Sequence, residues 1–160
     1  MSDIFKPPDV VNPCLRVKEV AGTAVLNILN VIFPFDQVDF DNFGAWDSTN
    51  NWYVCPQDGT YWLGACFRQF KPASWAENNG LYIVFLRDRS TESVLNIENI
   101  IGGANYRYGT ASTDQSVSGV AMFKCLKGDK LYVYFQSNQT GTTSGGSPDR
   151  TQLSICRIGE

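Results

Sequence analysis

The sequence predicts an all-β domain, a ten-stranded antiparallel sandwich or jelly roll. Three observations support this prediction. Short segments rich in Val, Ile, Tyr, Phe and Leu recur along the chain, Gly, Pro, Asn and Asp separate them, and aromatic residues make up 13% of the sequence. With 160 residues, the chain is also long enough to bury one substantial core.

The first residues predict an extended arm that precedes the sandwich. Pro7, Pro8 and Pro13 fix φ over residues 1–13 and disfavour a helix. Two interpretations are open: the arm lies on its own domain, or it docks to a neighbour or a larger assembly. We therefore expect an anchoring arm over residues 1–13 and a single domain over residues 14–160. The candidate anchoring residues are Ile4, Phe5, Pro7, Pro8, Val10 and Val11.

The predicted strands follow one another at short intervals. Their ranges are 15–20, 23–27, 31–40, 51–54, 60–67, 81–88, 94–101, 117–126, 130–136 and 151–158. In the range 94–101 the apolar spacing also fits a helix, so the two predictions compete there. A long loop is expected over residues 102–117, and a flexible connection over residues 140–146.

The strongest local signal is the turn Pro56-Gln57-Asp58-Gly59. Proline fixes φ at the entry to this turn, and glycine tolerates positive φ at its exit. Aromatic and β-branched residues flank the turn on both sides. The pattern therefore predicts an antiparallel hairpin between residues 51–54 and 60–67.

Several predicted strands carry apolar side chains on both faces. One set can fill the core, but leaving the other in water would forgo about 1.5–3 kcal/mol for each large side chain. Since large exposed apolar patches mark interfaces, we predict that the sheet with residues 61–67 and 132–135 packs against copies of itself. The alternative is that the loop 102–117 covers this face. The predicted interface residues are Tyr61, Leu63, Tyr82, Val84, Tyr132 and Tyr134.

Composition argues against several classes of function. The net charge is −3 and no basic tract is present, which disfavours nucleic-acid binding. Histidine is absent, so the commonest general base and metal ligand are missing. An enzyme would need carboxylates alone, for example Glu77, Glu92 and Glu98 converging with an aspartate in one cleft. We also expect no membrane span and no secretory signal, hence synthesis in the cytosol.

The five cysteines are Cys14, Cys55, Cys66, Cys125 and Cys156. None lies in a C-x-x-C pair, which disfavours a zinc site. Their odd number and scattered spacing favour reduced thiols in the core and a reducing compartment. A disulfide between two of the strands stays open, because the sequence gives no distance between them.

The order of these motifs resembles the complement C-one-q globular head, one of the tumour-necrosis-factor-like trimeric jelly rolls. The resemblance covers about residues 15–158. It departs from the animal proteins in lacking a collagen-like stalk and a secretory signal and in having the proline-bearing arm. These departures suit the related jelly rolls of bacteriophage virions. The motifs that carry it are Phe35-Asp36-Gln37-Val38, Trp46-Asp47, Tyr53-Val54-Cys55-Pro56, Gly59, Tyr61-Trp62-Leu63, Ser118-Gly119-Val120 and Leu126-Lys127-Gly128-Asp129-Lys130-Leu131.

The resemblance implies a non-enzymatic homotrimer without cofactor. It favours a structural or adhesive bacteriophage virion protein (capsid decoration, head fibre or tail-associated protein), made in the host cytoplasm and anchored by its arm. The alternative is an extracellular, lectin-like or cytokine-like recognition module. Some family members bind calcium near the threefold axis, which makes Asp36, Asp39 and Asp41 candidate ligands, although a solvated acidic loop without a metal is the preferred interpretation. Loop aromatic residues could contact a surface glycan or receptor, or could pack the rim of the sandwich; they are Trp75, Tyr106 and Tyr108.

Overall fold

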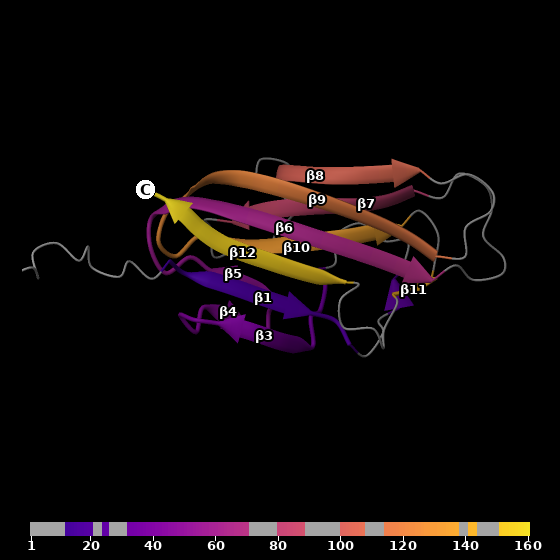
Figure 1. Cartoon of the computed structure of the whole chain (residues 1–160), viewed down its shortest axis with the longest axis horizontal. Helices are drawn as coiled ribbons and strands as arrows, with labels where there is room; N and C mark the ends of the chain where they lie inside the picture. The colour runs from indigo at the N-terminus through magenta and orange to yellow at the C-terminus, as the bar shows by residue number, and fades with distance from the viewer. Residues whose placement is uncertain are drawn as a thin grey trace, which may run out of the picture.

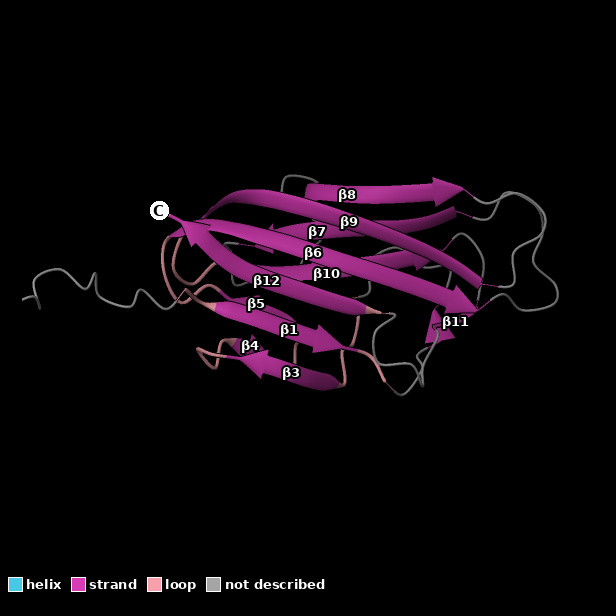
Figure 2. Ribbon diagram, viewed as in Figure 1, coloured by secondary structure: helices cyan, strands magenta, loops and turns pink. Residues whose placement is uncertain are grey.

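The computed structural model describes residues 12–20, 24–25, 32–70, 80–88, 100–107, 114–137, 141–143 and 151–160. These residues form twelve strands and no helix (Figures 1 and 2). No helix able to span a membrane is therefore found among them. The strands are β1 (Cys14–Lys18), β2 (Ala24–Val25), β3 (Gln37–Asp41), β4 (Trp46–Asp47), β5 (Trp52–Val54), β6 (Gly59–Phe70), β7 (Gly80–Asp88), β8 (Ile100–Arg107), β9 (Asp114–Cys125), β10 (Lys130–Ser137), β11 (Gly141–Thr143) and β12 (Gln152–Gly159).

Two antiparallel sheets pack face to face. Sheet A has seven strands in the order β2-β11-β6-β12-β1-β3, with β9 paired to β6, and sheet B has five in the order β4-β5-β10-β7-β8. In Figure 1, β9, β6, β12 and β1 lie side by side across the front of the sandwich. The predicted all-β antiparallel jelly-roll sandwich is confirmed, although it has more strands than the ten expected.

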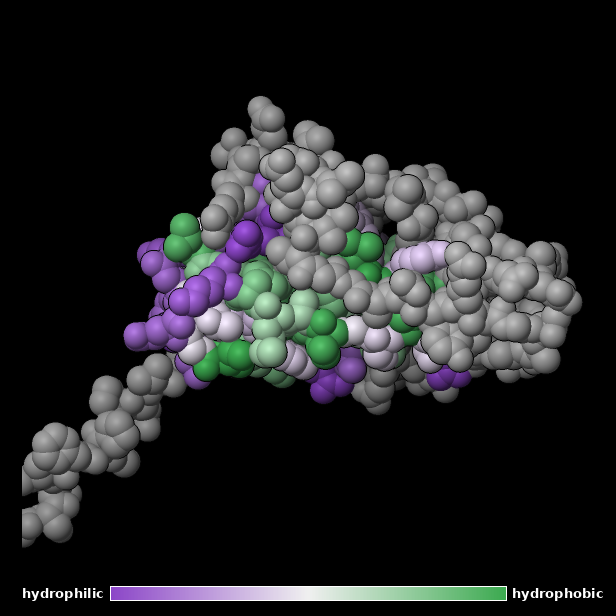
Figure 3. All heavy atoms as spheres, turned by 90° about the horizontal axis from the view of Figure 1, so that it is seen from above, coloured by the Kyte–Doolittle hydropathy of each residue, from purple (hydrophilic) through white to green (hydrophobic). Residues whose placement is uncertain are grey.

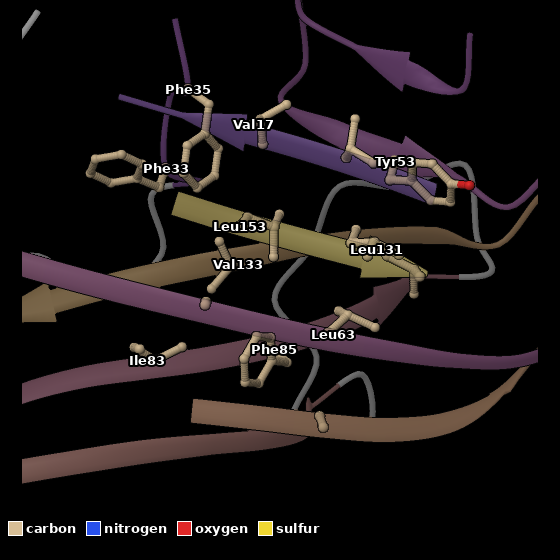
Figure 4. Close-up of a cluster of buried hydrophobic side chains, with 14 of the residues drawn as sticks. Val17, Phe33, Phe35, Tyr53, Leu63, Ile83, Phe85, Leu131, Val133 and Leu153 are labelled. Carbon is tan, nitrogen blue, oxygen red and sulfur yellow. The ribbon is translucent and has the colours of Figure 1, made fainter. Parts of the chain in front are cut away.

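The core lies between the sheets and follows the period of two in each strand. Leu63 of β6 and Leu153 of β12 meet Phe85 of β7 and Val133 of β10 from the opposite sheet (Figure 4). Aromatic rings form part of this core, and Phe67 and Phe135 stack with their centroids 4.7 Å apart. Alternate residues of both sheets are therefore committed to the core, and only the remaining set can face outward.

The predicted hairpin at Pro56–Gly59 is wrong, because the turn crosses from one sheet to the other. β5 pairs with β4 and β10 in sheet B, whereas β6 pairs with β12, β9 and β11 in sheet A. The backbone of Cys55 bonds to the β9–β10 turn instead of β6: Cys55 N–H donates to the Asp129 carbonyl at 2.8 Å. Gly59 has φ +151°, and a Cβ there would lie 2.5 Å from Arg157 Nε, so the crossing requires glycine.

Other differences concern the bounds of one strand, two short strands that were not expected, one of which (β11) lies within the expected connection 140–146, and one expected loop. The predicted strand 31–40 is interrupted by the irregular segment around Pro34, and regular pairing starts only at β3. The short strands β4 and β11 had no predicted counterpart. The segment 100–107 forms β8, paired with β7, so the described part of the expected loop 102–117 is strand rather than loop.

Candidate functional site

The outward-facing side of sheet A is the candidate site, and we call it the A face. Directly opposed residues in neighbouring strands point to the same side of a sheet. One row of the A face contains Met122, Trp62, Cys156 and Cys14, on β9, β6, β12 and β1 respectively. The next row contains Val120, Gly64, Ser154, Arg16 and, on β3, Phe40.

A hollow of about 380 Å³ opens on the β9–β6–β12 part of the A face. It exists because small residues lie beside large ones: its lining includes Trp62, Gly64, Cys66, Gly119, Val120 and Ser154. A Cβ on Gly64 would lie 2.5 Å from the Trp62 indole, so the ring lies across the strand only because Gly64 has no side chain.

The rim of the hollow exposes large apolar side chains. Val120 is 67% exposed and Met122 is 65% exposed, although both stand on the longest ladder of the sandwich, between β6 and β9. Figure 3 shows apolar side chains (green) reaching the surface beside hydrophilic ones (purple), in a view from above Figure 1. Full burial of one such side chain is worth about 1.5–3 kcal/mol, so this rim favours a protein partner.

A polar strip divides the A face. Arg16 Nη2 donates to Gln152 Oε1 at 2.7 Å, and Lys18 Nζ lies 2.6 Å from Asp39 Oδ1. Beyond this strip, at the β3 edge of the sheet, Phe40 stands opposite Arg16 and is 46% exposed. The A face therefore carries apolar surface at the hollow on one side of the strip and the exposed ring of Phe40 on the other.

The predicted interface residues Tyr61 and Leu63 are not on this face. Both are fully buried in the core between the sheets, so they cannot contact another subunit while the sandwich is intact. Residues 61–67 and 132–135 also belong to different sheets, on β6 and β10, so one sheet cannot present both. These two parts of the interface prediction are wrong, and the outward residue of β6 beside them is Trp62.

The other predicted interface residues lie on the outer face of sheet B. Tyr132 and Tyr134 are buried there with Leu86, and Val84 packs against this cluster from the neighbouring strand. Tyr82 is partly exposed on β7. Burial, with a smaller effect of Tyr134, raises the pKa of Tyr132 to about 12. The chain itself therefore shelters most of this cluster.

The acidic residues near β3 are occupied by contacts within the chain. Asp36 Oδ1 accepts the Val20 N–H at 2.8 Å, Asp41 Oδ2 accepts the Trp46 N–H at 2.8 Å, and Asp39 pairs with lysine and arginine of β1. No three His, Cys, Asp or Glu side chains converge among the residues that the structure describes. The calcium expectation stays a prediction without a described ligand set.

Several other expectations fall outside the described residues. These are the arm residues Ile4, Phe5, Pro7, Pro8, Val10 and Val11, the loop aromatics Trp75 and Tyr108, and the carboxylates Glu77, Glu92 and Glu98. Tyr106 lies in strand β8, not in a loop as expected.

The cysteines form two close pairs and leave one without a cysteine neighbour. Cys55 and Cys125 are buried in the core, where their mutual hydrogen bond and burial raise the pKa of Cys55. Cys14 and Cys156 are opposed on the A face and half-buried, and Cys66 lies beside the hollow. All five thiols are reduced in this structure. The prediction of core thiols thus holds for Cys55 and Cys125 but not for the other three.

Sequence reasoning missed the residues that make the hollow, although a signal was available. In the segment 61–67 one set of alternate residues is apolar and contains no glycine, whereas the other includes Gly64 and Cys66. A set containing glycine fills a core poorly, because interiors are close-packed. That criterion would have assigned Trp62, Gly64 and Cys66 to the outside.

The sequence matches no protein-family model and no curated protein sequence. Solved structures match in fold. Murine APRIL at pH 5.0 matches with TM-score 0.65 and 13% identity over 92% of this chain and 99% of that chain. The Eiger TNF of S. frugiperda matches with TM-score 0.65 and 8% identity over 93% and 94%.

The globular domain of the zebrafish complement 1qA protein matches with TM-score 0.56 and 16% identity, over 91% of this chain and 94% of that domain. At these identities the likeness establishes the fold. It spans nearly the whole chain, and two solved structures of tumour-necrosis-factor type and one of C-one-q type agree on it. The chain therefore has the TNF/C-one-q-like jelly-roll fold.

Proposed function

We propose that this chain is a non-enzymatic structural and adhesive module that works as a homotrimer, with the A face turned toward neighbouring subunits. The observation that carries the proposal is the exposure of two large apolar side chains at the hollow: Val120, which lines it, and Met122, which stands opposite Trp62 of its lining. The resemblance to trimeric jelly rolls supplies the number of subunits.

A ring of three subunits needs two different contact surfaces on each subunit, because its contacts are heterologous. The hollow at one side of the A face and the exposed ring of Phe40 at the other meet this need. Phe40 at the β3 edge stands in the same row as Gly64 and Val120, since Arg16 and Ser154 connect them through paired strands. In a ring whose axis runs along the strands, Phe40 of one subunit would therefore stand level with the hollow of the next.

Light scattering on the purified chain tests the trimer. The wild type should have three times the mass of one 17.8 kDa chain. Val120→Glu and Met122→Glu should dissociate it, because each places a carboxylate where a neighbour excludes water. Leu126→Glu is the matched control: Leu126 is an exposed apolar residue in the β9–β10 turn, away from the A face. A wild-type mass of one chain at all concentrations would refute the proposal.

Within this class we place the chain among bacteriophage virion components, anchored by its arm. The support is the resemblance together with the proline-bearing segment 1–13. Asn12 and Pro13 are bound to the domain, since the Asn42 side-chain amide donates to the Asn12 carbonyl and Arg157 N–H to the Pro13 carbonyl. Deleting residues 1–11 should therefore keep a folded trimer and abolish incorporation into particles. Unchanged incorporation would contradict the anchoring role.

A second candidate is a secreted recognition module. It is favoured by the two cysteine pairs, because extracellular domains commonly convert such pairs to disulfides. Specific binding of the intact trimer to a glycan array or a cell-surface receptor would support this candidate over the virion role.

A further inference from the structure

Cys14 and Cys156 occupy a position on the A face that suits a covalent link. They are directly opposed in the antiparallel pair of β1 and β12. The adjacent residues Pro13 and Arg157 form a hydrogen-bonded pair, since Arg157 N–H donates to the Pro13 carbonyl at 2.9 Å. Because the two kinds of pair alternate along an antiparallel ladder, the cysteines form a non-hydrogen-bonded pair, the kind in which side chains approach most closely.

The spacing of such a pair fits a disulfide. Non-hydrogen-bonded partners have Cα atoms about 4.5 Å apart, which lies within the range of about 4.4–6.8 Å found for disulfides. Burial and, after it, the Cys14 thiol raise the pKa of Cys156, so the two side chains interact, and both residues are partly exposed. A small oxidant can therefore reach two thiols on directly opposed residues.

We propose that Cys14 and Cys156 are a modification site, a dithiol that a low-molecular-weight disulfide converts into a cross-strand disulfide. One thiolate attacks the oxidant, forms a mixed disulfide and releases one small thiol. The second thiolate attacks the protein sulfur of that mixed disulfide and releases the other small thiol. The two protons and two electrons of the protein thiols thus pass to the oxidant, and one sulfur–sulfur bond replaces another.

The remaining cysteines are expected to react differently. Cys55 and Cys125 also lie together, but both are fully enclosed in the core, where no oxidant reaches them in the folded state. Cys66 is partly exposed beside the hollow and lies opposite Ser118 and Gln152, so the ladder gives it no second thiol. The chain thus contains an enclosed pair and a single accessible cysteine as internal references.

The disulfide would strengthen the root of the N-terminal arm. Force applied to the arm acts first on β1, a strand of five residues held between β12 and the edge strand β3. A covalent bond from Cys14 to Cys156 would pass that force to β12, which pairs with the long central strand β6. The reduced chain would be the form that assembles. The oxidised chain would be the form that resists a force pulling on its arm.

Refolding the full-length chain in a buffer of reduced and oxidised glutathione tests the proposal. Burial, followed by the hydrogen bond to Cys14, raises the pKa of Cys156 to about 12, so exchange in the folded state is slow near neutral pH. Refolding removes this barrier and does not depend on the oligomeric state. Because it also exposes Cys55 and Cys125 to the oxidant, the test uses the Cys55→Ala/Cys125→Ala chain as its parent, and the variants below are made in that parent. The product should lose two hydrogen atoms in intact mass, and peptide mapping after alkylation should find Cys14 joined to Cys156.

Variants distinguish this bond from other reactions. Cys14→Ser and Cys156→Ser should each abolish the loss of two hydrogen atoms, whereas Cys66→Ser should retain it. The closed loop spans nearly the whole chain, so oxidation should raise the melting temperature of the parent chain by roughly 10 °C and leave its Cys14→Ser variant unchanged. Recovery of all thiols, a bond between other cysteines, or a chain-to-chain disulfide on a non-reducing gel would overturn the proposal. None of these outcomes depends on whether the chain is a trimer.

Discussion

The apolar side chains on the outer faces of the two sheets are buried to different extents. On sheet B, Leu86 is fully buried and Tyr132 is 3% exposed. On sheet A, Val120 and Met122 leave about two thirds of their surface in water. Both faces include apolar outward side chains, so a similar feature of the sequence has two structural outcomes.

The neighbouring residues account for the difference. On sheet B, Ile32, Trp52 and Val84 of the same chain pack around the tyrosines, and Lys130 Nζ lies 4.2 Å from the centre of the Trp52 ring. On the A face, the row of Val120 contains Gly64 and Ser154, whose small side chains leave the hollow open. A strand that is apolar on both sides therefore indicates that cover is needed, but its neighbours decide whether the chain or a partner supplies it.

The largest predicted effect is on the self-covered face. Leu86→Ala should lower the free energy of unfolding by about 2–5 kcal/mol, because it leaves a cavity in a fully buried cluster. Urea denaturation measures this loss, and light scattering should show an unchanged oligomer. Val120→Ala is the contrasting variant: it should change subunit stability by less than about 0.5 kcal/mol, since exposed sites tolerate substitution. Equal losses in the two variants would remove the distinction between the faces.

The next effect concerns pH. Burial, with smaller effects of Tyr134 and Asp88, raises the pKa of Tyr132 from 10.0 to about 12. The folded chain therefore keeps a proton that the unfolded chain loses above its ordinary pKa, and stability falls between about pH 10 and pH 12. The loss from this group is roughly 2–3 kcal/mol.

Tyr132→Phe should remove this part of the alkaline loss. Denaturation curves for the wild type and the variant should diverge above pH 10 and nearly coincide at pH 7, where both side chains are uncharged. Curves that stay parallel up to pH 12 would show that Tyr132 is not enclosed, and the outer face of sheet B would then resemble the A face.

The sequence was sufficient for the fold class but not for the pairing of strands. Alternation in 61–67 and 131–135 predicts strands, and both are strands. The turn at Pro56–Gly59 was also found from its residues, but its role in crossing between the sheets depends on Asp129, more than sixty residues away, which bonds to Cys55. Local patterns cannot specify such a distant partner.

The sequence predicted that the candidate site is an exposed apolar face, but it did not identify the residues that form it. An exposed apolar face was expected, but it was assigned to Tyr61 and Leu63 rather than to Trp62. Choosing the wrong alternate set exchanges every side chain between core and surface, since the period of a strand is two. The edge patch at Phe40 was not predicted at all, because Phe40 is exposed only through the position of β3 at the end of the sheet order.

The smallest predicted effect tests how the A face meets its neighbour, and it rests on the proposed trimer. If Phe40 of one subunit contacts Val120 of the next, then Phe40→Glu and Val120→Lys should each weaken the trimer. The double variant should recover about 1 kcal/mol, because the new charges then face each other across each contact.

Phe40→Glu combined with Leu126→Lys adds the same charge away from the face and should recover nothing. Dissociation constants from light scattering over a dilution series give the coupling, and raised salt should reduce it, since screening weakens exposed ion pairs. Equal recovery in both double variants would mean that Phe40 and Val120 do not meet, although each could still lie in an interface.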